Sequence, residues 1–404
     1  MSMPRGFFRL LSAQFASGLA DHALLIVAIA WLPLWGLPGW VAPLLKLSFT
    51  LAYVLLAPGV GAVADAWPKA RVMQAANALK AAGLLALIAG VHPLAAFALI
   101  GLGAAIYAPA KYGLVTELAP PARLVAANAW LEVAMVGAIL LGTVLGGLLV
   151  GGDRLPWAMP AIGALYVLSA VLNLGVPSSG RAPQPLPARW QRLWPRFHFA
   201  QLRLWRDPDG ALSLAATTLF WGAGATMQFA VLRWAAERLG LPLDRAAMLQ
   251  AVVAVGVVAG AFAAGRWVPL ARARRVLPCG IALGLLVPVV AQVDSVAVAL
   301  PLLVAVGALG GALVVPMNAL LQHRGATLLS PGQSIAVQNF AENASVLAML
   351  AAYAGLLAAE VPLQALMTGL GLAVAAASAW LFSRSAGGAG SGSTLAAAGR
   401  PPSR

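Results

Sequence analysis

Two carboxylates lie deep inside long apolar stretches of this chain, where an ionised group needs either a partner or a function. Asp21 is about 12 residues into the first stretch, roughly 18 Å at 1.5 Å per residue, and Glu342 is similarly deep in the eleventh. Because a charge near the centre of a bilayer is costly, both are candidates for binding a substrate cation or carrying a proton. The alternative interpretation is that each pairs with a neighbouring helix and only stabilises the fold.

Further polar residues at membrane depth extend this candidate site. Lys80 in the third stretch and Lys111 late in the fourth could bind an anion, although a lysine near a span end can also extend its ammonium group to the interface. Asn128 and Glu132 in the fifth stretch are one helical turn apart and therefore share a face. Arg233, toward the outer end of the seventh, is either an anion ligand or an interfacial anchor.

The composition identifies these stretches as membrane spans. Of 404 residues, 61% are hydrophobic and 9% are charged, whereas a soluble domain carries about a quarter charged residues. The net charge of +14 does not indicate a nucleic-acid partner, because the basic residues lie in short loops beside apolar spans. The single cysteine, Cys279, excludes an internal disulfide and is interpreted as a small apolar residue. No metal site and no cofactor are expected, because metal-ligand spacing is absent from His22, His92, His198 and His323.

Apolar stretches of about 20 residues predict about twelve helical spans, and hence an all-α polytopic membrane protein. Loops on one side are strongly basic, as in Lys69, Arg71 and 266–275, whereas the opposite loops hold fewer cations, such as Lys46 and Arg154. The positive-inside rule therefore places both termini in the cytoplasm. No cleavable signal peptide is expected in the first stretch. The expected spans lie near 8–32, 41–64, 72–90, 93–115, 122–150, 156–176, 211–235, 246–265, 276–292, 295–319, 331–357 and 362–383.

The chain is predicted to divide into an N-terminal six-helix half (1–176), a cytoplasmic linker (177–210), a C-terminal six-helix half (211–384) and a disordered tail (385–404). Apolar residues of the linker recur close to helical spacing. This predicts an amphipathic helix on the cytoplasmic leaflet, with a simple tether as the alternative. The predicted apolar face consists of Trp190, Leu193, Trp194, Phe197 and Leu202, with Arg189, Arg192, Arg196 and Arg203 on the other faces.

An internal repeat relates the two halves. The segment from Gly103 through Pro109 reappears from Gly310 through Pro316, and these prolines lie 207 positions apart. Asn128 and Glu132 recur 211 and 210 positions later as Asn339 and Glu342. Adding 207 to the position of Asp21 gives Gln228, so we expect Asp21 and Gln228 to face one central cavity from opposite halves. A parallel duplication in an apolar chain predicts a two-halved transporter with its path between the halves.

The loop after the second span contains Gly61, Asp65, Lys69 and Arg71. This pattern resembles the cytoplasmic signature of the major facilitator superfamily, a glycine, an aspartate four residues later and then two basic residues. Ala66 and Pro68 depart from the usual basic residue and second glycine. The resemblance implies a conformational or gating role for the four residues of this loop.

Several sequence strings resemble the bacterial lysophospholipid transporter (LplT-type) branch of the major facilitator superfamily. The resemblance extends from about residue 8 to residue 384, with the strings in the same order along the chain. These strings are Ala20-Asp21-His22-Ala23-Leu24-Leu25, Ala108-Pro109-Ala110-Lys111-Tyr112-Gly113, Phe220-Trp221-Gly222-Ala223-Gly224, Val315-Pro316-Met317-Asn318-Ala319-Leu320-Leu321-Gln322 and Ile335-Ala336-Val337-Gln338-Asn339-Phe340-Ala341-Glu342-Asn343. The resemblance implies a flippase of the bacterial inner membrane that moves lysophospholipids, such as lysophosphatidylethanolamine, from the outer to the cytoplasmic leaflet. It also implies a separate acyltransferase that reacylates them with acyl carrier protein. We expect a monomer that contacts membrane lipids and is not an enzyme.

The resemblance places the family's intramembrane acids on Asp21 and Glu342, and its seventh-span arginine on Gln228. Arg233 lies five residues further on, about 140° around the helix, and is not a simple substitute. We expect the acids to meet an ammonium group and the lysines or Arg233 to meet the phosphate. The expected substrate-binding residues are Asp21, Gln228, Asn339, Glu342, Lys111, Lys80, Arg233, Asn128 and Glu132.

The expected mechanism is alternating access, in which the two halves rock about a central cavity. One alternative is a proton-coupled exporter of drugs or small amphiphiles, with Asp21 or Glu342 as the proton carrier. An enzyme would need a nucleophile and base near the interface, and the one adjacent histidine–acid pair, Asp21 and His22, lies too deep for that. A non-transporting sensor or scaffold would tolerate loss of every buried charge.

Overall fold

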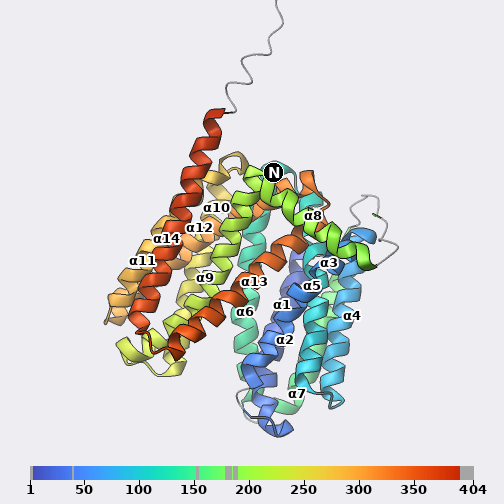
Figure 1. The fold of residues 1–404 in the computed structure, drawn as a ribbon. Helices are drawn as coiled ribbons and strands as arrows, with labels where there is room; N and C mark the ends of the chain where they lie inside the picture. Colours follow the sequence, from blue (N-terminus) through green and yellow to red (C-terminus); the bar gives the residue numbers. More distant parts are fainter. Residues whose placement is uncertain (1–2, 39–40, 152–153, 178–183, 185–189, 392–404) are drawn as a thin grey trace, which may run out of the picture. The chain divides into compact units, whose positions relative to one another are not determined.

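The structure, a computed structural model, describes residues 3–38, 41–151, 154–177, 184 and 190–391. These residues form fourteen α-helices and short 3-10 turns, with no strand among them (Figure 1). The α-helices are α1 (Arg5–Trp31), α2 (Ala42–Leu55), α3 (Ala57–Ala66), α4 (Lys69–Ile88), α5 (Pro93–Leu118), α6 (Leu124–Val150), α7 (Leu155–Leu174), α8 (Leu193–Arg206), α9 (Pro208–Leu239), α10 (Leu243–Trp267), α11 (Leu277–Gln292), α12 (Val296–Leu328), α13 (Pro331–Ala358) and α14 (Leu363–Ser391).

The helices match the expected spans closely. Within the described residues, nine helices are long and apolar enough to cross a membrane, and α2 with α3 forms a tenth span bent by 66°. The other two expected spans are α4 and α9, which carry more polar residues, including Lys80 in α4 and Arg233 in α9. The all-α polytopic membrane architecture predicted from the apolar stretches is therefore confirmed.

The helix boundaries follow local sequence signals. Proline occupies the first turn of α2, α3, α5, α7, α9 and α11. The N–H groups of a first turn have no partner within the helix, so a proline there costs no helical hydrogen bond. The carboxylate of Asp207 accepts a hydrogen bond from the N–H of Gly210 and caps α9, which ends at Gly240 in the left-handed conformation. The repeated prolines, Pro109 and Pro316, both lie inside helices, α5 and α12.

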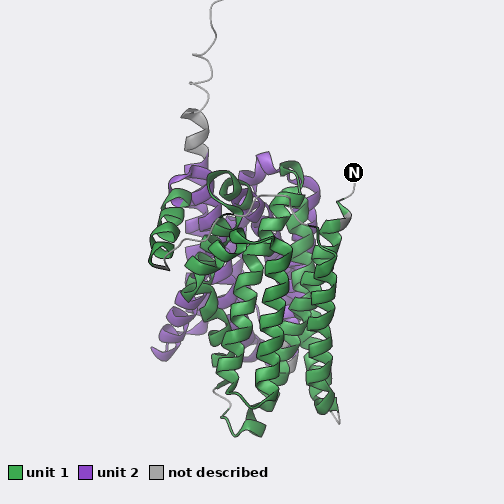
Figure 2. Ribbon diagram, turned by 90° about the vertical axis from the view of Figure 1, so that its right-hand side faces the viewer, with its two compact units in different colours: residues 1–204, 322–344 green, residues 205–321, 345–404 purple. Residues whose placement is uncertain are grey.

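The chain forms two compact units (Figure 2). Unit 1 contains residues 1–204 and 322–344, and unit 2 contains residues 205–321 and 345–404. In unit 1, α1 packs against α6 and α7, and α5 packs against α2 and α4. In unit 2, α14 packs against α9 and α11. Unit 1 thus includes the end of α12 and the beginning of α13, although both belong to the C-terminal half of the sequence.

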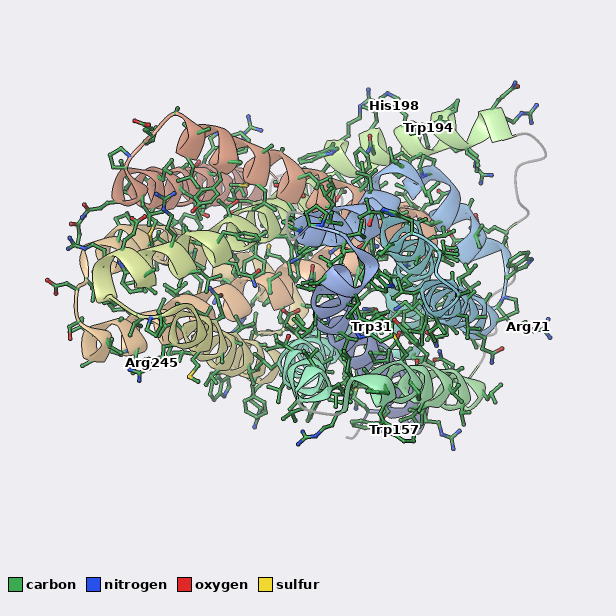
Figure 3. All side chains as sticks on the ribbon, turned by 90° about the horizontal axis from the view of Figure 1, so that it is seen from below. Trp31, Arg71, Trp157, Trp194, His198 and Arg245 are labelled. Carbon is green, nitrogen blue, oxygen red and sulfur yellow. The ribbon has the colours of Figure 1, made fainter. Side chains whose placement is uncertain are left out.

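The linker contains the expected helix, α8, but its protein-facing side differs from the predicted apolar face. Phe197, Ala200 and Leu204 are buried, and the Phe197 ring meets the Phe340 ring edge to face at 5.4 Å. Trp194 and Leu202 are exposed, so the residues assigned to one face are divided between two. Trp194 and His198 point outward in Figure 3. The linker residues 178–183 and 185–189, including Arg189, and residues 392–404 of the predicted tail lie outside the described residues, and α14 ends at Ser391.

Candidate functional site

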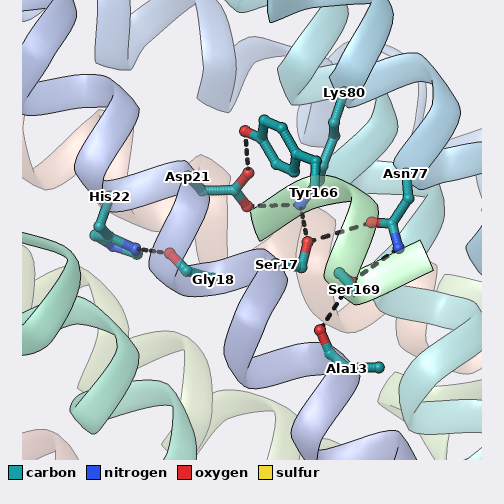
Figure 4. A network of polar contacts seen from close by, with 9 residues as sticks. All are labelled: Ala13, Ser17, Gly18, Asp21, His22, Asn77, Lys80, Tyr166 and Ser169. Carbon is teal, nitrogen blue, oxygen red and sulfur yellow. Dashed lines mark hydrogen bonds and ion pairs between the residues drawn. The ribbon is translucent and has the colours of Figure 1, made fainter. Parts of the chain in front are cut away.

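Asp21 is part of a buried ion pair that joins three helices of unit 1 (Figure 4). Its Oδ2 lies 2.5 Å from the Lys80 ammonium group of α4, and its Oδ1 accepts a hydrogen bond of 2.8 Å from the Tyr166 hydroxyl of α7. The Lys80 ammonium group also donates to the Ser17 hydroxyl at 2.9 Å. The sequence predicted that Asp21 needs a partner or a function, and the structure provides it with two partners.

The ion pair continues into a chain of neutral hydrogen bonds. Ser17 donates to the Asn77 carbonyl oxygen at 3.3 Å, and the Asn77 amide donates to the Ser169 hydroxyl at 2.9 Å. Ser169 in turn donates to the backbone carbonyl of Ala13 at 2.8 Å. Ser17 and Asp21 are four residues apart on α1, and Tyr166 and Ser169 are three apart on α7, so each pair shares a helix face. The sequence analysis did not identify Ser17, Asn77, Tyr166 and Ser169 as partners of the ion pair. The signal that could have found them is the spacing of three or four residues between polar side chains in an apolar helix.

The network borders a pocket of about 260 Å³ within unit 1. Its wall carries three lysines, Lys46, Lys80 and Lys111, but only one carboxylate, Asp21. Lys46 lies inside α2 and lines the pocket, so its assignment to an outer loop was wrong. The remaining lining residues are mainly apolar or aromatic and include Phe49, Thr50, Tyr53, Phe97, Tyr107 and Met135. An excess of ammonium groups over carboxylates suits a pocket that binds an anionic group.

Lys111 and Glu132 lie together on the α5 and α6 side of this pocket. Both are almost fully buried, and Glu132 attracts Lys111 electrostatically. The Lys111 ammonium group also lies 4.0 Å from the centre of the Tyr112 ring, within range of a cation–π interaction. The structure therefore brings Lys111 to the same pocket as Asp21 and Lys80, with Glu132 as its acidic neighbour.

Asn128 takes a different position from the pocket lysines. Its amide group forms two reciprocal hydrogen bonds, of 2.9 and 2.8 Å, with the amide group of Gln322 at the end of α12. Both side chains are buried. This pair ties α6 to the segment 322–344 inside unit 1.

The two candidate residues of α13 are also polar groups of unit 1. Glu342 accepts a hydrogen bond of 2.8 Å from the Gln338 amide, one turn earlier on the same helix. The Asn339 amide nitrogen is buried and makes no hydrogen bond within the described residues. Asn339 therefore offers a free donor, whereas Glu342 is held by its own helix.

The signature loop contacts the beginning of α13. The Asp65 carboxylate accepts hydrogen bonds from the N–H groups of Gly332 and Gln333, at 2.9 and 3.1 Å, and so caps α13. A Cβ atom on Gly61 would lie 2.8 Å from the Ala336 Cβ, so only glycine permits this approach.

The basic residues of the signature divide between two environments. Lys69 lies 3.5 Å from Asp65 and 3.4 Å from Glu117, which places its ammonium group between two carboxylates. Arg71 is exposed and points outward (Figure 3). The structure thus joins Gly61, Asp65 and Lys69 in one cluster and leaves Arg71 outside it.

Gln228 and Arg233 belong to unit 2. Gln228 lines a cavity of about 200 Å³ whose other lining residues are almost all apolar, and its backbone carbonyl accepts a hydrogen bond from Gln250. Arg233 is exposed and pairs with Glu237, one turn further along α9, at 2.5 Å. Of the predicted substrate-binding residues, Asp21, Lys80 and Lys111 therefore share one pocket, and Gln228 and Arg233 lie apart from each other in unit 2. Within the described residues, no group of three or more His, Cys, Asp or Glu side chains is placed to hold a metal ion.

Comparison with known proteins gives the same architecture. The family model described as Major Facilitator Superfamily matches residues 10–349. The lysophospholipid transporter LplT of Yersinia enterocolitica is 41% identical over 362 residues, which cover 89% of this chain and 89% of that protein. LplT of Yersinia pestis (strain Pestoides F) is 40% identical over 353 residues, or 87% of this chain and 86% of that protein.

Solved transporter structures share the fold at low sequence identity. A bacterial homologue of the iron transporter ferroportin in an outward-facing state has a TM-score of 0.74 and 16% identity, over 95% of this chain and 100% of that chain. The human organic anion transporter MFSD10 has a TM-score of 0.69 and 19% identity, also over 95% of this chain and 100% of that chain. The predicted transporter fold is confirmed by these likenesses. The chain belongs to the Major Facilitator Superfamily and, within it, to the family of the lysophospholipid transporters LplT.

Proposed function

We propose that this protein transports lysophospholipids and moves them from the outer to the cytoplasmic leaflet of the bacterial inner membrane. The observation that carries the proposal is the cation-rich pocket of unit 1, enclosed by helices that cross the membrane. A phosphodiester headgroup needs cationic partners at membrane depth, and a soluble substrate would not need so apolar a surrounding. Relatives about 40% identical over most of their length are named lysophospholipid transporters, which supports the same substrate class.

The headgroup phosphate is proposed to bind the lysines of the pocket. Lys80 donates to both Asp21 and Ser17, so Asp21 holds its ammonium group at the pocket wall. Because Asp21 is paired with Lys80 and accepts a hydrogen bond from Tyr166, its proposed role is to position Lys80 at the pocket wall. Glu132 has the corresponding role toward Lys111. Asn339, with its free amide donor, is a further candidate ligand for a headgroup oxygen.

Within unit 2, the apolar cavity is proposed as a site for a hydrocarbon chain. Leu219, Phe220, Val253, Leu283 and other apolar residues line this cavity, and Gly224 leaves one wall open. Burial of a methylene group is worth about 0.8 kcal/mol, so a cavity of this composition favours a hydrocarbon chain. Gln228 contributes one of its few polar groups.

Transport is proposed to proceed by alternating access. Two contacts hold the segment 322–344 within unit 1. One is the cap that Asp65 forms on α13, and the other is the hydrogen-bonded pair of Asn128 and Gln322. We propose that these contacts break and re-form during the cycle, with Gly61 and Lys69 in the same cluster as Asp65 and Arg71 exposed outside it. Both termini are proposed to be cytoplasmic, which places this cluster on the cytoplasmic side.

The proposed product is a lysophospholipid in the cytoplasmic leaflet, where a separate acyltransferase that uses acyl carrier protein restores the second acyl chain. The protein itself is proposed to act as a monomer, without enzymatic activity or a cofactor.

Uptake of labelled lysophosphatidylethanolamine into spheroplasts that express this chain, with and without a protonophore, tests the proposal. Uptake that survives the protonophore supports a lysolipid flippase. Absence of uptake, with intact protein in the membrane, contradicts the proposal and favours the proton-coupled exporter of drugs or small amphiphiles.

A further inference from the structure

Lys46 is a cation of the unit 1 pocket that the ion pairs described above do not include. Lys46, Phe49, Thr50 and Tyr53 lie at positions i, i+3, i+4 and i+7 of α2, and all four line the pocket. The side chain of Lys46 is exposed at this wall. Lys46 lies in the second turn of α2, which begins at Ala42, and its place in the pocket wall makes its ammonium group available to an anionic ligand.

The charges around the pocket leave Lys46 without an acidic neighbour. Asp21 offsets Lys80, and Glu132 offsets Lys111. Within the described residues, Lys46 forms no hydrogen bond or ion pair, and no carboxylate attracts it appreciably. The nearby His22 ring does not neutralise it, because its Nδ1 atom bonds to the Gly18 carbonyl and its charge interaction with Lys46 is repulsive. The pocket therefore carries one positive charge more than its acids balance.

An empty pocket can hydrate this charge, but a bound lipid displaces that water. The ammonium group then loses its solvation unless the ligand provides an anionic partner. A zwitterionic headgroup adds a further ammonium group to a pocket that already has three lysines and one carboxylate, which is paired with Lys80. A glycerol headgroup carries the phosphate charge and adds only hydroxyl groups, which can bond without repelling the lysines.

We propose that Lys46 is an anion-binding residue that biases the pocket toward lysophospholipids with a net negative headgroup over zwitterionic ones. This inference rests on the proposed function, because it names the headgroup class that the same site prefers. It assigns the preference to one residue of α2.

Ligand binding by the purified full-length protein in neutral detergent tests the inference directly. Melting temperatures are measured during titration with 1-palmitoyl lysophosphatidylglycerol or 1-palmitoyl lysophosphatidylethanolamine, and they give an apparent affinity for each lipid. The wild type is expected to bind the glycerol lipid about tenfold more tightly, which corresponds to about 1.4 kcal/mol. Lys46→Gln is expected to remove most of this preference, and Lys46→Arg to retain it.

A matched control separates Lys46 from general charge effects. Arg154→Gln removes an exposed cation of the same unit that does not line the pocket, and it should keep the wild-type preference. If Lys46→Gln does not fold, Lys46→Met keeps the length of the side chain and takes its place. An unchanged preference in a folded neutral variant, or no preference in the wild type, overturns the inference.

Uptake of the same two lipids by spheroplasts separates the two proposals. If neither lipid enters but binding preference depends on Lys46, transport as proposed is wrong and the anion site stands. If both lipids enter and the binding preference does not depend on Lys46, the Lys46 inference is wrong and the proposed function stands.

Discussion

Asp21→Asn separates the structural and functional interpretations of the buried acid. The Lys80 side chain is 3% exposed and that of Asp21 is 14% exposed, so the substitution leaves a buried ammonium group facing a neutral amide. Removing one partner of a buried ion pair costs about 3–5 kcal/mol, because the remaining charge loses its compensation. We expect the variant to melt at least about 5 °C below the wild type and to lose lysolipid uptake.

The double variant Asp21→Asn/Lys80→Gln removes both charges. It should recover most of the lost thermal stability, because no unpaired charge is left, but it should not recover uptake, because the phosphate loses Lys80. Asp294→Asn, at an exposed position, is the control for a carboxylate-to-amide change. Melting temperature in detergent and uptake by spheroplasts are the two measurements. A single variant as stable as the wild type would refute the energetic argument, and uptake by the double variant would refute the role of Lys80.

Three further sets of substitutions test other parts of the molecule. Asp65→Ala removes the cap on α13 and should cost about 1 kcal/mol of stability and reduce uptake, with Asp294→Ala as the control. Unchanged melting and uptake would contradict the role of the cap. Asn128→Ala and Gln322→Ala should each cost about 1–3 kcal/mol, and the double variant should cost less than their sum; additive losses in melting measurements would show that the amide pair is not coupled. Gly224→Leu extends a side chain from a position with no neighbouring atoms within 4 Å of a new Cβ, so it should fold and lower uptake of a long-chain lysolipid more than of a short-chain one. Equal effects on both chain lengths would contradict the proposal that the unit 2 cavity takes a hydrocarbon chain.

The sequence predicted the helices well because their physical cause is local. A run of about 20 apolar residues determines a span by itself, and the prolines in the first turns fix where several helices begin. The Asp21 ion pair was less accessible to prediction. Both Asp21 and Lys80 were identified as candidates, but their contact depends on how α1 and α4 both pack against α7, which no local pattern specifies.

The errors have the same origin. The apolar stripe of α8 was visible in the sequence, but only packing shows that Phe197 faces the protein while Trp194 and Leu202 face outward. Lys46 was assigned to a loop because charge counting places cations outside apolar spans, whereas α2 includes it in a pocket wall. A lone lysine inside a span is a candidate site residue, and that criterion, applied to Lys46 as it was to Lys80, would have found it.

The distribution of cations bears on how this chain recognises a phosphate. The resemblance to the family implied an arginine where Gln228 stands, and Arg233 was the nearest cation on the same helix. Arg233 does not replace it, because its guanidinium group is exposed and paired with Glu237. No charged residue is among the described residues that line the unit 2 cavity, whereas three lysines line the pocket of unit 1. Under the proposed function, phosphate recognition therefore falls to α2, α4 and α5, and a cation introduced at Gln228 would add a positive charge to a wall that otherwise suits hydrocarbon.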